Sequence, residues 1–175
     1  MSAATSAKSN NTIIRTAFNP DDIPVIATLA EQTWAPTYQN ILSAEQLNFM
    51  FQEIYNPEAL KQQMEAGQQF LLLFQDQAPA GFASYSALPD NSFKLNKLYV
   101  SPAFHGYGLG RLLINAVEEA VKHVSGTTLL LNVNRNNPAR SFYEKCGYTI
   151  AYEEDIPIGP YFMNDYVMQK KLAVT

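Results

Sequence analysis

The spacing of hydrophobic residues along this chain divides it into strand-like and helix-like segments. Residues 12–18 alternate between apolar and polar side chains, which predicts a strand, and the turn-forming residues 19–22 then precede a helix over Ile23 to Trp34. Two further amphipathic helices are predicted, one beginning at Ser43 and one at Pro57. The chain therefore opens with a strand followed by helices.

The middle and end of the chain alternate between strand and helix patterns. A polar turn at residues 76–77 predicts a hairpin, and a third strand follows it directly. Apolar residues at steps of three and four from Leu109 to Val124 predict one long helix. A shorter helix is expected from Ala139 to Cys146, with Asn137-Pro138 at its start and Gly147 at its end. The predicted strands are 69–74, 81–86, 93–100, 128–133, 148–153 and 162–170, and a loop over residues 156–160 separates the last two.

This order of strands and helices predicts a mixed α/β fold with a β-α-β crossover around the long helix. The chain has 175 residues, 47% of them hydrophobic, which is the length and composition of one domain with a normal core. We expect a single domain over residues 12–175, preceded by a flexible tail over residues 1–11.

Composition excludes several classes of partner. The net charge is −4 and lysine and arginine do not cluster, so a nucleic acid is not expected as a partner. A single cysteine cannot form an internal disulfide, and His105 and His123 lie too far apart to act as a helical ligand pair, so no metal site is expected. The sequence shows neither a signal peptide nor a membrane-length apolar run, and we therefore predict a cytoplasmic protein without membrane association.

The most informative segment is His105-Gly106-Tyr107-Gly108-Leu109-Gly110-Arg111, between a predicted strand and the long helix. Alternate glycines leave the backbone bare where the helix begins, and the first amides of a helix lack internal partners and carry the positive end of its dipole. Such a turn can bind a phosphate, although similar turns also occur as purely structural connections. The glycine spacing matches neither a P-loop nor a dinucleotide-binding fingerprint.

Together with a second motif, this loop resembles a known family. Asn136-x-x-Ala139-x-x-Phe142-Tyr143-Glu144-Lys145-Cys146-Gly147-Tyr148 follows the loop at the appropriate distance. Over residues 12 to 172 the chain resembles the GNAT superfamily of acetyl-CoA-dependent N-acetyltransferases. The resemblance implies a single-domain, twisted, mostly antiparallel mixed sheet of about seven strands, flanked by helices. In that fold strands 4 and 5 splay apart, and acetyl-CoA, the cosubstrate, enters the gap.

The resemblance also assigns roles to individual positions. The glycine loop matches the family's pyrophosphate site, the preceding strand matches the segment whose backbone pairs with the pantetheine arm, and Asn136 matches a cofactor-contacting asparagine. His105 stands where the family usually has arginine or glutamine. The cofactor-binding residues implied are Leu98, Tyr99, Val100, His105, Gly106, Tyr107, Gly108, Leu109, Gly110, Arg111, Asn136 and Tyr143.

Tyr143 is the expected catalytic residue. A phenol has a higher pKa than a thiol, so it can donate a proton to the departing thiolate without being ionised itself. A tyrosine on an apolar helix face can also be a packing residue, and the motif around Tyr143 favours the catalytic role. The general base stays open: the predicted fourth strand carries no acid, and Glu31, Glu153 and Asp165 are candidates that can equally be solvated or capping carboxylates.

Several readings of the function remain. The first is transfer of an acetyl group to a primary amine of a small molecule, polyamine, peptide or protein, by direct attack in a ternary complex. The second is a noncatalytic acyl-CoA-binding or sensory module with the same fold, and the third is an antibiotic-modifying or toxin-type acyltransferase. Trp34, Tyr38, Tyr161 and Phe162 are expected in segments that border the acceptor pocket, and a homodimer is possible.

Overall fold

A computed structural model describes residues 11–18 and 20–173 of the chain. Within these ranges the strands form one 7-stranded sheet in the order β1-β2-β3-β4-β5-β7-β6, which confirms the predicted mixed α/β fold. The strands are β1 (Thr12–Thr16), β2 (Gln69–Gln75), β3 (Ala78–Ala87), β4 (Ser92–Val100), β5 (Thr128–Asn134), β6 (Thr149–Ile158) and β7 (Tyr161–Lys171). The helices are α1 (Ile23–Tyr38), α2 (Ala44–Tyr55), α3 (Pro57–Glu65), α4 (Leu109–His123) and α5 (Ala139–Lys145), with the 3₁₀ turn η1 (Pro102–Phe104).

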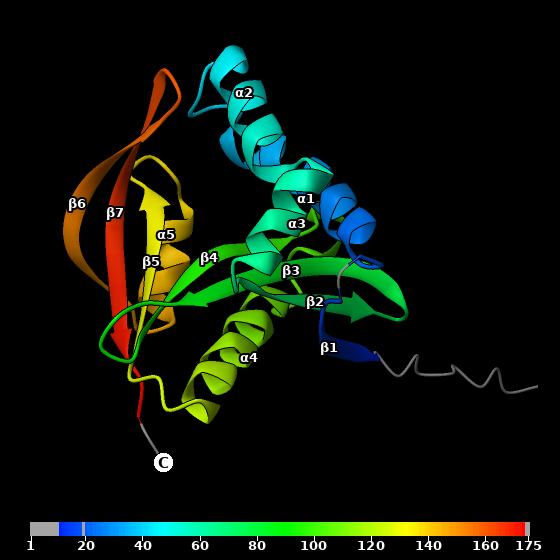
Figure 1. The fold of residues 1–175 in the computed structure, drawn as a ribbon, viewed down its shortest axis with the longest axis vertical. Coiled ribbons are helices and arrows are strands. Elements are labelled where there is room, and N and C mark those ends of the chain that lie inside the picture. Colours follow the sequence, from blue (N-terminus) through cyan, green and yellow to red (C-terminus); the bar gives the residue numbers. More distant parts are fainter. Residues whose placement is uncertain (1–10, 19, 174–175) are drawn as a thin grey trace, which may run out of the picture.

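The sheet consists of two halves that separate between β4 and β5. These two strands pair in parallel from Ser92↔Thr128 to Leu95↔Leu131, while every other neighbouring pair is antiparallel. Beyond Leu95 the two strands continue to Val100 and Asn134 without pairing to each other. The predicted splay between strands 4 and 5 is therefore confirmed, and Figure 1 shows β1–β4 and β5–β7 as the two arms.

A bulge in β4 changes which side chains face which side of the sheet. Ser84 pairs with Lys97 and Tyr85 pairs with Leu95, so Asn96 has no partner of its own on β3. As a result, Leu95 and Leu98 both pack into the core beneath α4, although they are three residues apart. Lys97 therefore lies on the opposite face from Leu98, toward α2 and α3.

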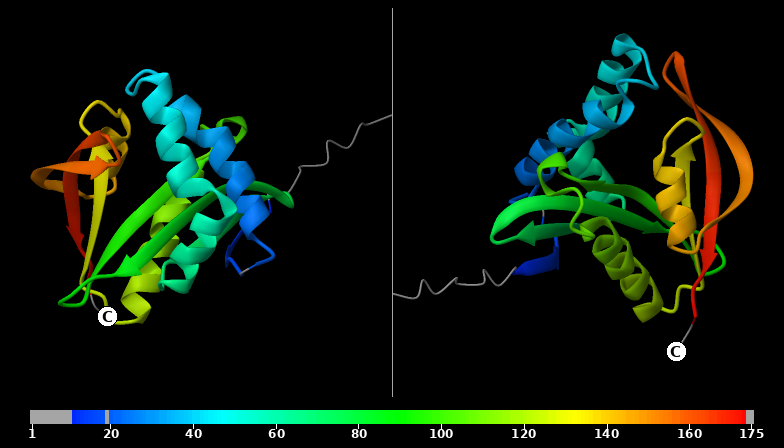
Figure 2. Two further views of the ribbon diagram at one scale, coloured as in Figure 1. Left: turned by 45° about the horizontal axis from the view of Figure 1, so that its top comes forward. Right: turned by 180° about the vertical axis from the view of Figure 1, so that it is seen from behind.

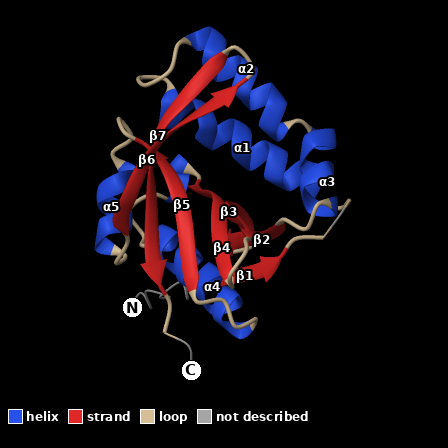
Figure 3. Ribbon diagram, turned by 60° about the vertical axis from the view of Figure 1, so that its left-hand side comes forward, coloured by secondary structure: helices blue, strands red, loops and turns tan. Residues whose placement is uncertain are grey.

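Helices cover both faces of the β1–β4 half. The long helix α4 packs against β3 and β4 on one face, and α1 packs on the same two strands from the other face, with α2 and α3 beside it. The two faces have separate cores, one with Leu113, Val117 and Leu131 under α4 and one with Ile26, Leu60 and Phe82 under α1. At the far end, the Gln46 amide of α2 donates to the Phe162 carbonyl at 2.9 Å, which ties α2 to the β6–β7 hairpin (Figure 3).

Several predicted element ends are corrected by the structure. The predicted 156–160 loop is wrong, because β6 continues to Ile158 and pairs with β7, leaving only Gly159 and Pro160 as the turn. Helix α1 runs on through Pro36 to Tyr38, and β3 is longer than expected at both ends. Pro138 takes the N-cap position of α5 in place of Asn137, whose side-chain oxygen still accepts from the Ala139 amide at 2.9 Å.

The first described residue lies against the β2–β3 turn. The proposed tail lies outside the described residues except for Asn11, whose amide donates to Asp76 at 2.9 Å. Residue 11 is therefore joined to the β2–β3 turn. In that turn Asp76 and Gln77 both adopt positive φ, as the predicted hairpin requires.

Candidate active site

The glycine loop presents open backbone at the start of α4. Gly106 has φ +86°, and Gly108, the N-cap residue of α4, has φ +71° in the left-handed region. A side chain at either position would meet nothing within 4 Å, so the amides around them are approachable from outside. Because α4 is a long helix, its N-terminal amides carry the positive end of its dipole, as an anion site requires.

A groove of about 570 Å³ lies over this loop. The side chains of Arg111 and His105 border it, but each also has a contact within the protein. Arg111 donates to the Lys145 carbonyl at 2.7 Å, and the His105 ring lies 2.8 Å from the Val100 carbonyl. The groove is lined by Leu98, Val100, Phe104, His105, Gly106, Gly108, Leu109, Gly110, Arg111, Ala139, Phe142 and Tyr143.

A second cavity, of about 580 Å³, continues from this groove into the gap between the two halves of the sheet. Its walls come from α1, α2, β4, the ends of β5 and β6, the start of β7, and α5 with the loop before it. The groove and the cavity share five wall residues, which makes them one continuous channel from the glycine loop to the interior. The shared residues are Leu98, Val100, His105, Ala139 and Tyr143.

Tyr143 stands at the junction of the groove and the cavity. Its side chain is buried, and burial raises the pKa of its hydroxyl well above the ordinary value for tyrosine. The hydroxyl therefore stays protonated across the physiological pH range. On the other side of the cavity, the hydroxyls of Tyr38 and Tyr99 lie 3.2 Å apart, and the Trp34 ring packs on Tyr38 at 4.4 Å between centroids.

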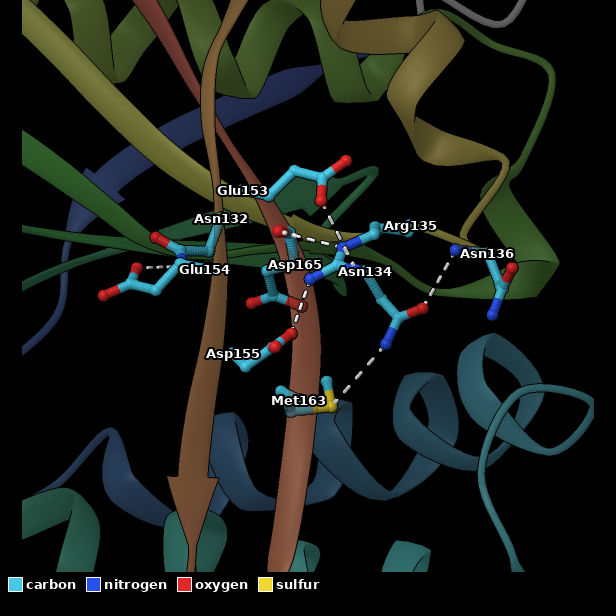
Figure 4. Close-up of polar contacts among 9 residues, drawn as sticks. All are labelled: Asn132, Asn134, Arg135, Asn136, Glu153, Glu154, Asp155, Met163 and Asp165. Carbon is cyan, nitrogen blue, oxygen red and sulfur yellow. Dashed lines mark hydrogen bonds and ion pairs between the residues drawn. The ribbon is translucent and has the colours of Figure 1, made fainter.

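Most of the residues implied by the family resemblance line the channel, and two do not. Leu109 borders the groove, although its side chain is buried in the core under α4. Tyr107 is 69% exposed and does not border the groove. Asn136 is exposed, whereas its neighbour Asn137 borders the cavity. The backbone amide of Asn136 donates a hydrogen bond to the side-chain oxygen of Asn134 at 2.9 Å (Figure 4).

The expected aromatic wall is present in part. Trp34 and Tyr38 line the cavity, but Tyr161 and Phe162 do not. The Tyr161 ring packs on Phe49 at the α2 end of the molecule, and Phe162 is exposed. The residue that completes the wall is Tyr55 of α2, which no sequence motif marks.

Lys97 is the least expected residue of the cavity wall. It is buried, and its Nζ donates to the side-chain oxygens of Gln63 and Gln68 at 2.7 and 2.9 Å, close to the face of the Tyr55 ring. Burial lowers the pKa of this amine to about 7, and the positive charge of Lys94 adds to the effect. The cavity therefore holds a lysine whose charge is only partly developed at neutral pH.

Asp165 of β7 is the one carboxylate on the cavity wall among the described residues. It is buried, and burial raises the pKa of its side chain to about 6. The two other candidate carboxylates lie elsewhere: Glu153 is exposed on β6 and pairs with Arg135 at 3.6 Å, and Glu31 is exposed on α1. The structure thus separates three candidates that were equivalent in the sequence.

Comparison with known proteins identifies this arrangement. A family model described as an acetyltransferase (GNAT) domain matches residues 37–157, which include β4, the glycine loop, α4 and α5. This chain belongs to the GNAT family. Among the described residues of this GNAT domain, no helix is both long and apolar enough to cross a membrane.

Individual relatives match the GNAT domain to different extents. A spermidine N(1)-acetyltransferase from Thermoplasma acidophilum is 26% identical over 157 residues, covering 86% of this chain and 92% of that protein. A crystal structure of the PaiA N-acetyltransferase from the same organism, in complex with coenzyme A, superposes with a TM-score of 0.78 at 27% identity, covering 92% of this chain and 99% of that one. An uncharacterised N-acetyltransferase from Mycobacterium bovis is 32% identical over 94 residues, 53% of this chain, and the match spans only 60% of that relative.

Proposed function

We propose that this GNAT domain transfers an acetyl group from acetyl-CoA to a primary amine by direct attack in a ternary complex. The observation that supports this most strongly is the continuous channel, which joins an anion site at the start of α4 to a buried tyrosine and a buried carboxylate. A two-ended channel fits a long cosubstrate entering from one side and an acceptor from the other. Coenzyme A bound to the PaiA N-acetyltransferase of similar fold is consistent with this proposal.

The loop residues fit the charged end of the proposed cosubstrate. Open space at Gly106 and Gly108 lets a diphosphate approach the amides at the start of α4. Beyond Leu95 the edge of β4 that faces β5 is unpaired, so an extended arm with amide groups can add to it as a strand would. Acetyl-CoA supplies the activated acetyl group, and the glycine loop and β4 hold that group in place.

Tyr143 is proposed as the proton donor. As the amine nitrogen bonds to the acetyl carbon, the carbon–sulfur bond breaks and the sulfur carries the electron pair. The Tyr143 hydroxyl, kept protonated by its burial, can transfer its proton to that thiolate. Unpaired amides on β4 are suited to stabilise the negative oxygen that forms on the way.

The charges along the cavity favour an acceptor that brings a single ammonium group into it. Lys94 and Lys97 border the cavity, and Asp165 is its one carboxylate among the described residues. A polyamine would place further positive charges beside these lysines, whereas a monoamine or the amino terminus of a peptide would not. We therefore propose an acceptor of the latter kind, although one relative is named a spermidine acetyltransferase.

The test is release of coenzyme A thiol from acetyl-CoA in the presence of phenethylamine, alanylalanine or spermidine. We expect turnover, with kcat/KM higher for phenethylamine or the dipeptide than for spermidine. Tight acetyl-CoA binding in calorimetry without thiol release for any amine would support a noncatalytic module and overturn the proposed function. Preference for spermidine would overturn the assignment of the acceptor alone.

A further inference from the structure

We propose that Asp165 binds the ammonium group of the acceptor and accepts its proton during acetyl transfer. This inference rests on the proposed function, because it assigns a residue to a step of that reaction. It also states which chemical group the inner cavity recognises, namely a protonated primary amine.

The first support is an unsatisfied hydrogen-bonding atom. Asp165 is 5% exposed, and its Oδ1 is the one buried side-chain nitrogen or oxygen among the described residues that has no hydrogen-bond partner. In Figure 4 no dashed contact reaches this carboxylate, whereas the carboxylates of Glu154 and Asp155 each have one. An unpartnered buried acceptor is costly and rare in native proteins, so it indicates a missing partner.

The second support is the position of the carboxylate in the channel. Asp165 lies on β7 opposite Asn134 of β5, at the wall of the cavity that also holds Tyr38 and Tyr143. Burial raises the pKa of the Tyr38 hydroxyl, and the negative charge of Asp165 adds to the rise, so the two side chains are electrostatic neighbours. Burial also raises the pKa of Tyr143, and Tyr38 adds to that rise. A ligand in this cavity can therefore reach both a proton acceptor and a proton donor.

The third support is that neighbouring groups leave Asp165 able to exchange a proton near neutral pH. Burial raises its pKa to about 6, and Glu154 of β6 adds to the rise, while the Asn132 amide, Lys94 and Arg135 oppose it. Arg135 directs its guanidinium to Glu153 and Asp155, so it does not neutralise Asp165. A carboxylate with a pKa close to the working pH is well matched to accept a proton from a bound ammonium.

The groups in the channel account for each proton and bond in the transfer. The acceptor enters as an ammonium ion and forms an ion pair with the Asp165 carboxylate. One proton moves from the nitrogen to Asp165, the freed electron pair forms the bond to the acetyl carbon, and the carbon–sulfur bond breaks. The thiolate takes its proton from Tyr143, and the new amide nitrogen releases its second proton, which restores the Tyr143 hydroxyl through water. Asp165 later loses the transferred proton to bulk water, so the net products are the amide, the coenzyme A thiol and one proton.

The kinetic experiment compares Asp165→Asn with wild type and with Asp155→Asn as a matched control. Asp155 is an exposed carboxylate on the adjacent strand, paired with Arg135 outside the cavity. With phenethylamine we expect kcat/KM to fall about 100-fold in Asp165→Asn and to be unchanged in Asp155→Asn. Wild-type kcat/KM should decline below the pH of about 6 at which Asp165 becomes protonated.

A less basic acceptor distinguishes a role of Asp165 in proton transfer from a role in positioning the acceptor alone. β,β-Difluorophenethylamine has nearly the shape of phenethylamine, but a larger share of it is unprotonated at neutral pH, so it depends less on a base. The defect of Asp165→Asn should shrink at least tenfold with the fluorinated amine. An equal defect with both amines, or wild-type activity of Asp165→Asn with phenethylamine, would overturn the inference while leaving the proposed function standing.

Denaturant unfolding tests the environment of Asp165 without any acceptor. A carboxyl whose folded pKa is raised from 3.8 to about 6 destabilises the fold increasingly as pH rises through that interval. Asp165→Asn should therefore unfold at a higher denaturant concentration than wild type at pH 7 and at the same concentration at pH 3.5. Destabilisation of Asp165→Asn at pH 7 would indicate a structural role and overturn the inference. Absence of thiol release by wild type with every amine would overturn the proposed function, and this inference with it.

Discussion

Individual residues of the channel differ in how visible they are in the sequence. Gly106 and Gly108 are recognisable because glycines directly before a helix allow left-handed backbone and close approach of an anion to the helix amides. Tyr143 is recognisable from its motif, and the structure adds that it is buried at the junction of groove and cavity. Asp165 and Lys97 have no such local signal, because their importance comes from burial among residues distant in sequence.

Replacing the hydroxyl of Tyr143 tests the proposed proton donor. We expect Tyr143→Phe to lower kcat about 100-fold with an unchanged dissociation constant for acetyl-CoA, because only the transferred proton is removed. Tyr148→Phe is the matched control: its ring lies 6.1 Å from Tyr143, and its hydroxyl donates to Glu118 outside the channel. Steady-state kinetics and calorimetry on both variants distinguish the roles, and equal kcat values for Tyr143→Phe and wild type would exclude Tyr143 as the donor.

Adding a side chain at Gly108 tests the anion site. Gly108→Glu places a negative charge beside the amides that start α4, so we expect the dissociation constant for acetyl-CoA to rise more than about tenfold. Gly67→Glu is the control for charge and backbone strain, since Gly67 also has positive φ, +100°, and also has open space around it. Calorimetry should show near wild-type affinity for the control, and equal losses in the two variants would contradict the site.

At the scale of elements, periodicity predicted α4 and the succession of strands and helices along the chain, but not where strands end or bend. The β4 bulge at Asn96 inverts the alternation of side chains, which places Lys97 in the cavity and Leu98 in the opposite core. Bulges depend on the register between two strands, and one strand's sequence does not specify them. The extension of β6 through Pro157 is similar, because an edge strand tolerates proline where a central strand does not.

One buried contact joins α4 to the β5–β7 half of the sheet. Glu118 of α4 accepts hydrogen bonds from Lys170 of β7 and from Tyr148, each at 3.0 Å. Glu118→Ala leaves the Lys170 ammonium without its partner, so we expect the free energy of unfolding to fall by about 3 kcal/mol. Glu65→Ala, which removes an exposed helical ion pair with Lys61, should change it by less than about 0.5 kcal/mol in the same urea titration. Equal losses would show that the Glu118 contact adds nothing beyond a surface pair.

For the whole molecule, the decisive feature is that the two arms of the sheet diverge and the channel runs between them. Residues from α1, β4, α5 and β7 meet there although they are far apart along the chain. A ligand that fills the channel contacts both arms and therefore favours the folded state over the unfolded one.

Ligand binding should accordingly stabilise the whole fold. At an acetyl-CoA concentration of about 100 times its dissociation constant, we expect the free energy of unfolding to increase by about 2.7 kcal/mol. The midpoint of urea unfolding should shift upward in wild type and in Gly67→Glu, and by at most about half as much in Gly108→Glu at the same concentration. A shift of the same size in Gly108→Glu would mean that the cosubstrate binds elsewhere.

The sequence by itself determined the fold class, the helix faces, the glycine loop and the motif tyrosine, because each of these depends on residues within one or two turns or one strand. The tertiary structure decided which carboxylate lies in the cavity, that a lysine joins it there, and that Asn137 borders the cavity while Asn136 is exposed. These features depend on strand register, on the bulge in β4 and on burial between two diverging arms of a sheet. Such quantities arise only when distant segments pack together, and local periodicity carries no information about them.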